Sequence, residues 1–365
     1  MSQLTNGAYQ SRGRRRASRA KRWTLVAVCI ALLGAIAYPV LDYFEVFSDK
    51  GEAISFGAND GKGGPQKEGS KALMPLGPDA GFKISGTVPE NGTKIAVTTY
   101  TGKKSGFTGK VWVWAPKQYD DPAYKDKGFP VLIALPGGAG FPNNYWMGTD
   151  LKLQSSVQKW SEEGKSLPFI IAMPVLNPEN HDKDPHDPKA GLYWDGSDIP
   201  GQPKMGTWLT EDVPQLIKEN FRTIKSRDGW AFMGSSTGGT AGLKAVLQKP
   251  DKFKAVIASG PDIVPDSRLW KGHEKEQADN NSKVLAKRLI AKGGPEVYLA
   301  LQVGAKEPVK PPIDAFVAKY GNKGPVKSKY YVIQNGEHNA KTYVPNMETG
   351  GLIQWISEHM QKPVG

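Results

Sequence analysis

The chain has 365 residues, 39% of them hydrophobic and 23% charged, which is ordinary for a globular protein and excludes disorder of the whole chain. The net charge of +12 would suit a nucleic-acid-binding protein. However, seven positive residues stand within residues 12–22 before any Asp or Glu, and +12 less seven leaves +5 for the remainder. The basic character therefore belongs to a tail, and we expect no nucleic-acid partner.

An uncharged apolar run follows this basic leader. Residues 23–41 contain no charged side chain over 19 positions, about the length that crosses a bilayer as a helix. Positive charge precedes the run and acidic residues follow it, which predicts a cytoplasmic tail over residues 1–22 and an extracytoplasmic body. We expect a single-pass membrane anchor; the alternative is a cleaved secretory signal, because Ala-Ile-Ala at 35–37 fits a cleavage site. The only cysteine, Cys29, lies in this run, so the body has no disulfide.

A stretch rich in Gly, Lys, Pro and Ser follows over residues 42–80 and is typical of a flexible linker. From 81 to 365, short β-prone runs alternate with amphipathic stretches, which predicts an α/β catalytic domain with a mostly parallel sheet. Chemistry in such sheets gathers at the carboxyl ends of the strands. The predicted strands are 110–115, 131–135, 169–173, 230–233, 255–259, 297–303 and 330–333, and the predicted helices are 209–220, 236–247, 282–291 and 347–360.

A G-x-S-x-G motif centred on Ser236 joins one predicted strand to the following helix. Small residues two positions before and after the serine are needed where the chain turns sharply and exposes the hydroxyl. The helix N-terminus also favours negative charge that develops beside the serine. The motif predicts Ser236 as a nucleophile; the alternative is a Gly- and Ser-rich turn in which Ser235 or Ser236 caps the helix.

A serine nucleophile needs a histidine as base, and three histidines follow Ser236 in the sequence. His338 lies directly after the predicted strand 330–333, at a carboxyl end, and is the predicted base. His273 lies in a segment rich in Lys and Glu, and His359 lies in the predicted C-terminal helix. Both are typical of solvated surface positions.

The acid that orients the base should stand between the serine and the histidine in the sequence. Glu307 follows the predicted strand 297–303 and is the predicted acid. Asp262 and Asp266, which follow the strand 255–259, are the alternative acids.

Two backbone N–H groups are needed to bind the oxyanion of the tetrahedral intermediate. Thr237, directly after the nucleophile, is predicted to supply one, and Gly138 in the glycine-rich loop 136–140 is predicted to supply the other. This loop does not fit a dinucleotide-binding fingerprint, because Asn143 stands where the third glycine would fall. We expect no cofactor.

With these residues in place, the chain resembles the esterase D group of α/β hydrolases, and most of all the exported mycolyltransferases of actinobacterial cell envelopes. The similarity runs from about Val131 to Trp355, and its most specific part is residues 207–260, with "TWLTEDVPQLIKENFRT" leading into "GWAFMGSSTGGTAGLKAVLQKPDKFKAVIASG". The resemblance implies an α/β-hydrolase fold with Ser236 as nucleophile, Glu307 as acid and His338 as base. It also implies Gly138 and Thr237 as oxyanion donors.

Residues 177–198 combine histidines and aspartates with prolines. A metal site, a substrate-rim loop and a plain surface loop are all compatible with this composition, but the prolines break any helical ligand spacing, and we expect no metal. In the enzymes that the chain resembles, the corresponding loop borders the active-site cleft. The resemblance therefore makes Trp194 and Asp195 candidates for substrate contact.

These features predict an extracytoplasmic serine esterase or acyltransferase that forms an acyl-enzyme on an ester of an envelope lipid, glycolipid or polysaccharide. The acyl acceptor is water or a sugar hydroxyl. Two alternatives remain: a simple secreted carboxylesterase, and a catalytically inert envelope-binding protein on a hydrolase scaffold.

Overall fold

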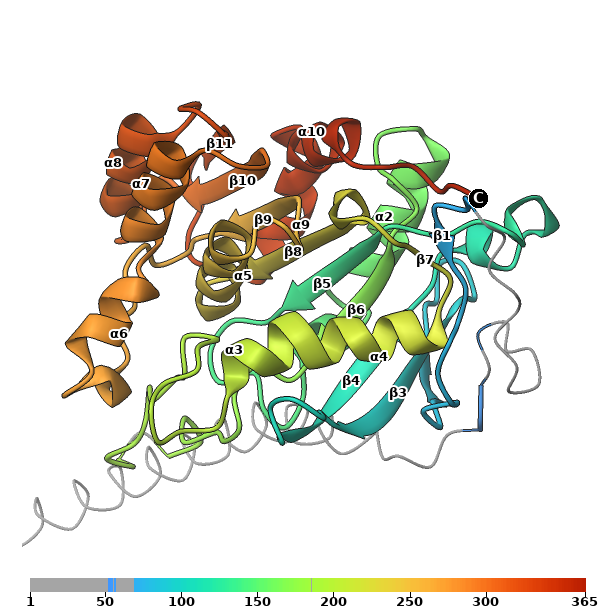
Figure 1. Cartoon of the computed structure of the whole chain (residues 1–365), viewed down its shortest axis with the longest axis horizontal. Coiled ribbons are helices and arrows are strands. Elements are labelled where there is room, and N and C mark those ends of the chain that lie inside the picture. Colours follow the sequence, from blue (N-terminus) through green and yellow to red (C-terminus); the bar gives the residue numbers. More distant parts are fainter. Residues whose placement is uncertain (1–51, 55, 57–68, 185) are drawn as a thin grey trace, which may run out of the picture. The chain divides into compact units, whose positions relative to one another are not determined.

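Strands rich in Val, Ile, Leu and Ala build a nine-stranded sheet in this computed structural model (Figure 1). The structure describes residues 52–54, 56, 69–184 and 186–365. The order is β11-β10-β9-β8-β5-β6-β4-β3-β2. The six strands from β6 to β11 in this order run parallel, and β4, β3 and β2 continue the sheet antiparallel. The strands are β2 (Lys83–Thr87), β3 (Lys94–Thr101), β4 (Thr108–Trp114), β5 (Val131–Leu135), β6 (Ile170–Pro174), β8 (Trp230–Ser235), β9 (Ala255–Ser259), β10 (Val297–Gly304) and β11 (Val326–Ile333).

Helices cover both faces of the sheet, because its parallel connections run in opposite directions from the centre. The β8-α5-β9 connection moves toward β11, whereas β5-α2-β6 moves the other way, and right-handed crossovers place α5 and α2 on opposite faces. Accordingly α5 packs with α7, whereas α2 packs with α9, which in turn packs with α10. The helices are α2 (Leu153–Glu162), α3 (Met205–Thr207), α4 (Val213–Asn220), α5 (Thr237–Gln248), α6 (Glu274–Asp279), α7 (Ser282–Lys292), α8 (Lys310–Tyr320), α9 (Ala340–Thr349) and α10 (Leu352–His359).

The predicted α/β fold with a mostly parallel sheet is confirmed. The change of direction between β5 and β8 is a topological switch point, and open α/β sheets bind ligands outside the carboxyl ends of the strands at such points. The loop after β5 and the serine after β8 both lie there. This topology fixes where the functional side chains can meet.

The predicted C-terminal helix 347–360 is wrong as a single helix. The structure has α9 and α10, with Gly350 and Gly351 between them and Gly351 at φ 61°. A left-handed glycine ends one helix and lets the chain change direction, so that α10 packs on β9, β10 and β11 while α9 packs on α10 and α2. The predicted helix 209–220 begins earlier, at Met205, and passes through a π-helical turn at Trp208–Asp212.

The predicted cytoplasmic tail and membrane span, 1–22 and 23–41, lie outside the described residues. Within the described ranges, no helix combines the length and apolar character needed to cross a membrane. The described part of the expected linker 42–80 makes contacts with the domain. β1 (Ala72–Leu73) pairs with β7 (Thr223–Ile224), and the Phe56 ring centroid lies 4.9 Å from that of Phe221.

Asp212, the last residue of the π-helical turn Trp208–Asp212, connects that turn to the β3–β4 hairpin. Its side chain is buried, and its two carboxylate oxygens accept the backbone N–H groups of Lys104 at 2.9 Å and Ser105 at 2.8 Å. The hairpin turn therefore depends on a single carboxylate from a distant part of the chain.

Replacing this carboxylate should destabilise the fold without altering the chemistry. We expect Asp212→Ala to lower the free energy of unfolding by about 1–3 kcal/mol, because two N–H groups lose an ionised acceptor. Asp212→Asn, which keeps one acceptor oxygen, should lose less. Urea unfolding monitored by circular dichroism measures both. Identical transition midpoints for Asp212→Ala and the wild type would contradict this role.

Candidate active site

Ser236 occupies a strained turn between β8 and α5. Its backbone adopts φ 53° and ψ −125°, a region that residues other than glycine rarely occupy. The Ser236 N–H donates to the Ser259 carbonyl at 2.8 Å, at the end of the neighbouring strand β9. A Cβ at Gly238 would overlap the Leu135 carbonyl at the end of β5, so the last glycine of the motif is required by close backbone packing.

His338 and Glu307 come together at the carboxyl ends of β11 and β10. His338 Nδ1 lies 2.6 Å from Glu307 Oε2. The other carboxylate oxygen, Oε1, accepts the Gly304 N–H at 2.5 Å and the Tyr343 hydroxyl at 2.7 Å. Glu307 is 4% exposed, and its buried carboxylate accepts hydrogen bonds from three groups of the protein. Such a carboxylate can orient an imidazole and stabilise its protonated form.

The hydrogen bonds set the protonation behaviour of this pair. Burial alone would raise the pKa of Glu307, but hydrogen bonds from His338, Gly304 and Tyr343 outweigh it and hold that pKa below its usual value. The hydrogen bond to Glu307 raises the pKa of His338 against the opposing effect of burial. The negative charges of Glu307 and Asp262 add to the increase.

Ser236 and His338 both border the end of β9. Ser236 binds the Ser259 carbonyl, and a Cβ at Gly260 would lie 3.0 Å from His338 Cε1. In the described chain no hydrogen bond joins the Ser236 hydroxyl to His338. Nucleophile–base contacts in ligand-free enzymes are often long and shorten when substrate binds.

Two backbone N–H groups beside Ser236 have no acceptor among the described residues. They belong to Thr237, at the N-terminus of α5, and to Gly138, which has φ 63°. The N–H of Gly137, by contrast, donates to the Tyr145 hydroxyl at 2.8 Å. Free N–H groups at a helix N-terminus and in an adjacent glycine turn are the kind of donors that bind an oxyanion.

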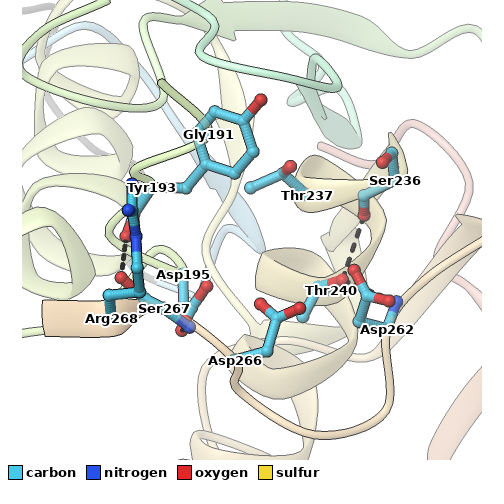
Figure 2. A pocket seen from close by; sticks show the side chains of 10 residues that line it. All are labelled: Gly191, Tyr193, Asp195, Ser236, Thr237, Thr240, Asp262, Asp266, Ser267 and Arg268. Atoms are coloured by element: carbon cyan, nitrogen blue, oxygen red, sulfur yellow. Dashed lines mark hydrogen bonds between the residues drawn. The ribbon is translucent and has the colours of Figure 1, made fainter. Parts of the chain in front are cut away.

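A polar cavity opens beside Ser236 and Thr237 (Figure 2). Burial, followed by the charges of Asp266 and Asp195, raises the pKa of Asp262 in its wall to about 6. The cavity is lined by Gly191, Tyr193, Asp195, Ser236, Thr237, Thr240, Asp262, Asp266, Ser267 and Arg268. The two aspartates that sequence reasoning left as alternative acids thus lie in the cavity wall, while Glu307 contacts the histidine.

The two candidates for substrate contact lie in different surroundings. Trp194 is buried, its Nε1 donates to Gln202 Oε1 at 3.3 Å, and it is absent from the cavity lining. Asp195 borders the cavity, but its Oδ2 accepts Trp270 Nε1 at 2.7 Å. Tyr193, one residue earlier, faces the cavity, and its hydroxyl lies 4.0 Å from where a Cβ at Gly138 would be. No sequence signal distinguished Tyr193 from its neighbours in this aperiodic loop.

The histidine-rich part of the same loop forms ion pairs. His181 contacts Glu179 Oε2 through Nε2 at 2.7 Å and Asp187 Oδ2 through Nδ1 at 2.9 Å. Across the described ranges, no group of three or more His, Cys, Asp or Glu side chains is arranged to hold a metal ion. The loop lies at the border of the cavity through Gly191 and Tyr193.

Comparison with known proteins identifies the family. A family model described as "Putative esterase" matches residues 106–349, well over half of the chain, so the chain belongs to this esterase family. An uncharacterized protein of Corynebacterium glutamicum is 26% identical over 160 residues, 42% of this chain and 33% of that protein. Mouse S-formylglutathione hydrolase is 32% identical over 83 residues, 22% of this chain and 29% of the mouse protein. The matches therefore span about a third of these relatives.

Solved structures share the fold at low identity. A ferulic acid esterase superposes with a TM-score of 0.56 at 18% identity, covering 73% of this chain and 99% of the esterase. An S-formylglutathione hydrolase from Agrobacterium tumefaciens gives 0.55 at 17% identity, covering 74% and 96%. The chain therefore has an α/β-hydrolase fold and belongs to a family of esterases.

Gly260 should be intolerant of any side chain. Its φ is 54°, and a Cβ there would lie 2.5 Å from both Glu307 Oε2 and Tyr343 Oη. We expect Gly260→Ala to abolish more than 95% of esterase activity toward p-nitrophenyl acetate, roughly the effect of displacing a catalytic group by 1 Å. A matched substitution, Gly272→Ala, has open space around the added methyl group and a similarly positive φ of 83°. Equal activity losses in the two variants would contradict the steric explanation.

Proposed function

We propose that the chain is an extracytoplasmic serine esterase or acyltransferase that acts through Ser236, His338 and Glu307. The observation that carries the proposal is the 2.6 Å contact between His338 Nδ1 and Glu307 Oε2, beside the strained turn at Ser236. A histidine held by a carboxylate through Nδ1 presents Nε2 as a proton acceptor.

The proposed reaction has two steps. Ser236 Oγ transfers its proton to His338 and attacks the ester carbonyl, and His338 then gives the proton to the leaving alcohol as the C–O bond breaks. Water or a sugar hydroxyl next loses a proton to His338 and attacks the acyl-enzyme carbonyl. The bond between the acyl carbon and Ser236 Oγ then breaks, and His338 returns the proton to Ser236 Oγ. Glu307 remains ionised throughout and stabilises the imidazolium form of His338.

Gly138 and Thr237 are the proposed oxyanion donors. The free N–H groups at these positions support this role, and so does the position of Thr237 at the N-terminus of α5, where the helix dipole favours negative charge. Tyr193 and Asp195 are the proposed substrate contacts from the loop, with Trp194 acting as a buried support.

The proposed substrate is an ester of an envelope lipid, glycolipid or polysaccharide. The polar lining of the cavity beside Ser236 supports an alcohol or acyl portion that carries hydrogen-bonding groups. The choice of this class also rests on the resemblance to actinobacterial mycolyltransferases that the sequence of residues 207–260 leads us to expect. We propose that residues 23–41 anchor the enzyme in the cell membrane with residues 1–22 in the cytoplasm; removal as a secretory signal is the alternative. Alkaline carbonate extraction of membranes from cells that produce the full chain distinguishes the two, because only an anchored chain stays in the pellet.

Fluorophosphonate labelling of the detergent-solubilised full chain tests for an activated serine. We expect the wild type to be labelled, and Ser236→Ala and His338→Ala to lose at least 99% of the labelling rate, because the nucleophile or its base is missing. Ser155→Ala, which changes a half-buried serine on α2, serves as the control and should label like the wild type. A folded wild type that resists labelling would favour the inert scaffold.

The acceptor is decided by product analysis. The enzyme is given a p-nitrophenyl acyl ester with and without methyl glucoside, and acyl glucoside is quantified by mass spectrometry. Acyl glucoside formed at the expense of free acid establishes an acyltransferase, whereas free acid alone establishes a carboxylesterase.

The pH dependence should report His338. Activity requires the neutral imidazole, and Glu307 raises the pKa of His338, so the acid limb of kcat/KM should lie above pH 6.5, the ordinary histidine value. Glu307→Gln removes the negative charge, so the limb should move to lower pH, while kcat falls by a factor of roughly 10²–10⁴. Initial rates between pH 4.5 and 9 measure both effects. An acid limb that does not move in Glu307→Gln would refute the pairing.

A further inference from the structure

The segment after the oxyanion loop is fixed to the ends of the central strands. Asn144 Nδ2 donates to the Ala134 carbonyl and to the Pro174 carbonyl, both at 2.8 Å. Trp146 Nε1 donates to the Leu135 carbonyl at 2.8 Å. Both side chains are buried, so Tyr145 between them is held at a defined place above β5.

The Tyr145 hydroxyl joins the two loops that surround the nucleophile. It accepts the Gly137 N–H at 2.8 Å and forms a short hydrogen bond with Ser235 Oγ, directly before Ser236. A Cβ at Gly137 would lie 3.3 Å from Tyr145 Oη and 3.2 Å from Ser236 Cβ, so this junction is adjacent to the nucleophile. Burial raises the pKa of Tyr145, so the hydroxyl keeps its proton at working pH.

We propose that Tyr145 is a positioning residue that fixes the oxyanion loop relative to Ser236; this inference rests on the proposed function. Because the Gly137 N–H is bound to Tyr145, the Pro136–Gly137 peptide has a fixed orientation. This peptide directly precedes the one that carries the Gly138 N–H, which stays free for the oxyanion. The bond to Ser235 ties the same hydroxyl to the backbone that carries the nucleophile. Oxyanion donors contribute fully only when they are preorganised at the place where the charge develops.

The neutral Tyr145 hydroxyl acts by holding the geometry of the loop and not by supplying charge. A phenol hydroxyl has one proton and two lone pairs, which is enough to bind both Gly137 and Ser235 at once. Phenylalanine at this position would preserve the ring, which contacts Trp146 with ring centroids 4.9 Å apart, and would remove only the two hydrogen bonds. Without these bonds, the Pro136–Gly137 peptide would be free to rotate, and the Gly138 N–H that follows it would lose its fixed position.

The test compares Tyr145→Phe, Ser235→Ala and the double variant in the full chain, with Tyr124→Phe as the control. The Tyr124 hydroxyl makes no side-chain hydrogen bond within the described residues, and its ring contact with Phe129 survives the substitution. Three quantities are measured: kcat and KM for p-nitrophenyl acetate, the inhibition constant of a trifluoromethyl ketone that forms a tetrahedral adduct with an oxyanion, and the melting temperature.

We expect Tyr145→Phe to lower kcat about 10- to 100-fold with KM within twofold of the wild type. The inhibition constant of the trifluoromethyl ketone should rise by the same factor, because the ketone adduct and the transition state use the same donors. Ser235→Ala should cost less, since the bond to Gly137 remains, and the double variant should lose little more than Tyr145→Phe. Tyr124→Phe should match the wild type.

The outcomes separate this inference from the proposed function. Wild-type enzyme without esterase activity or fluorophosphonate labelling would overturn the proposed function itself. An active wild type with Tyr145→Phe changed less than threefold in kcat would overturn the role of Tyr145 alone. A lower melting temperature with unchanged kcat and unchanged ketone affinity would also overturn it, because Tyr145 would then act on stability only.

Discussion

The site depends on the packing of backbone around the sharp turn at Ser236. The serine adopts a positive φ that costs energy, and the surrounding structure must hold it there. Two contacts do so: the N–H of Ser236 binds the end of β9, and Gly238 lies directly against the end of β5. Because β5, β8 and β9 are neighbouring buried strands, the strained turn is held by the buried centre of the sheet.

The neighbouring ends of β10 and β11 supply the charged groups of the site, Glu307 and His338. Glu307 is buried and would be unfavourable as an anion without its donors, yet three hydrogen bonds keep it ionised. One of these donors, Tyr343, comes from α9, which packs with α10. The acid is therefore positioned jointly by a strand end and by a helix that follows the histidine in sequence.

The sequence can single out residues that stand at fixed offsets from strands, but it carries no signal for contacts made across the fold. Ser236, Glu307 and His338 each follow a strand with strong β propensity, so their positions could be predicted from the order of elements. Tyr145 meets Ser235 across 90 residues, and no periodicity connects the two. Trp194 was selected in place of Tyr193 because a loop without regular structure gives no sign of which side chain faces inward. The break at Gly350 and Gly351 was missed because the apolar pattern continues through it.

The residues of the cavity wall differ in how freely they can change while the nucleophile is kept in place. Lys244, on the helix that starts at Ser236, is buried and donates to the Asp195 carbonyl at 2.9 Å, while the Asp195 carboxylate accepts Trp270 Nε1. Any replacement at Lys244 or Asp195 would disturb the helix that carries the nucleophile. Asp266 and Arg268 line the same cavity but are exposed. Arg268 donates to the Pro188 and Ala190 carbonyls of the neighbouring loop, whereas the Asp266 side chain has no such tie within the described residues. Divergence toward new esters, in nature or in laboratory evolution, therefore has its freer position at Asp266, where the side chain can change while the nucleophile stays in place.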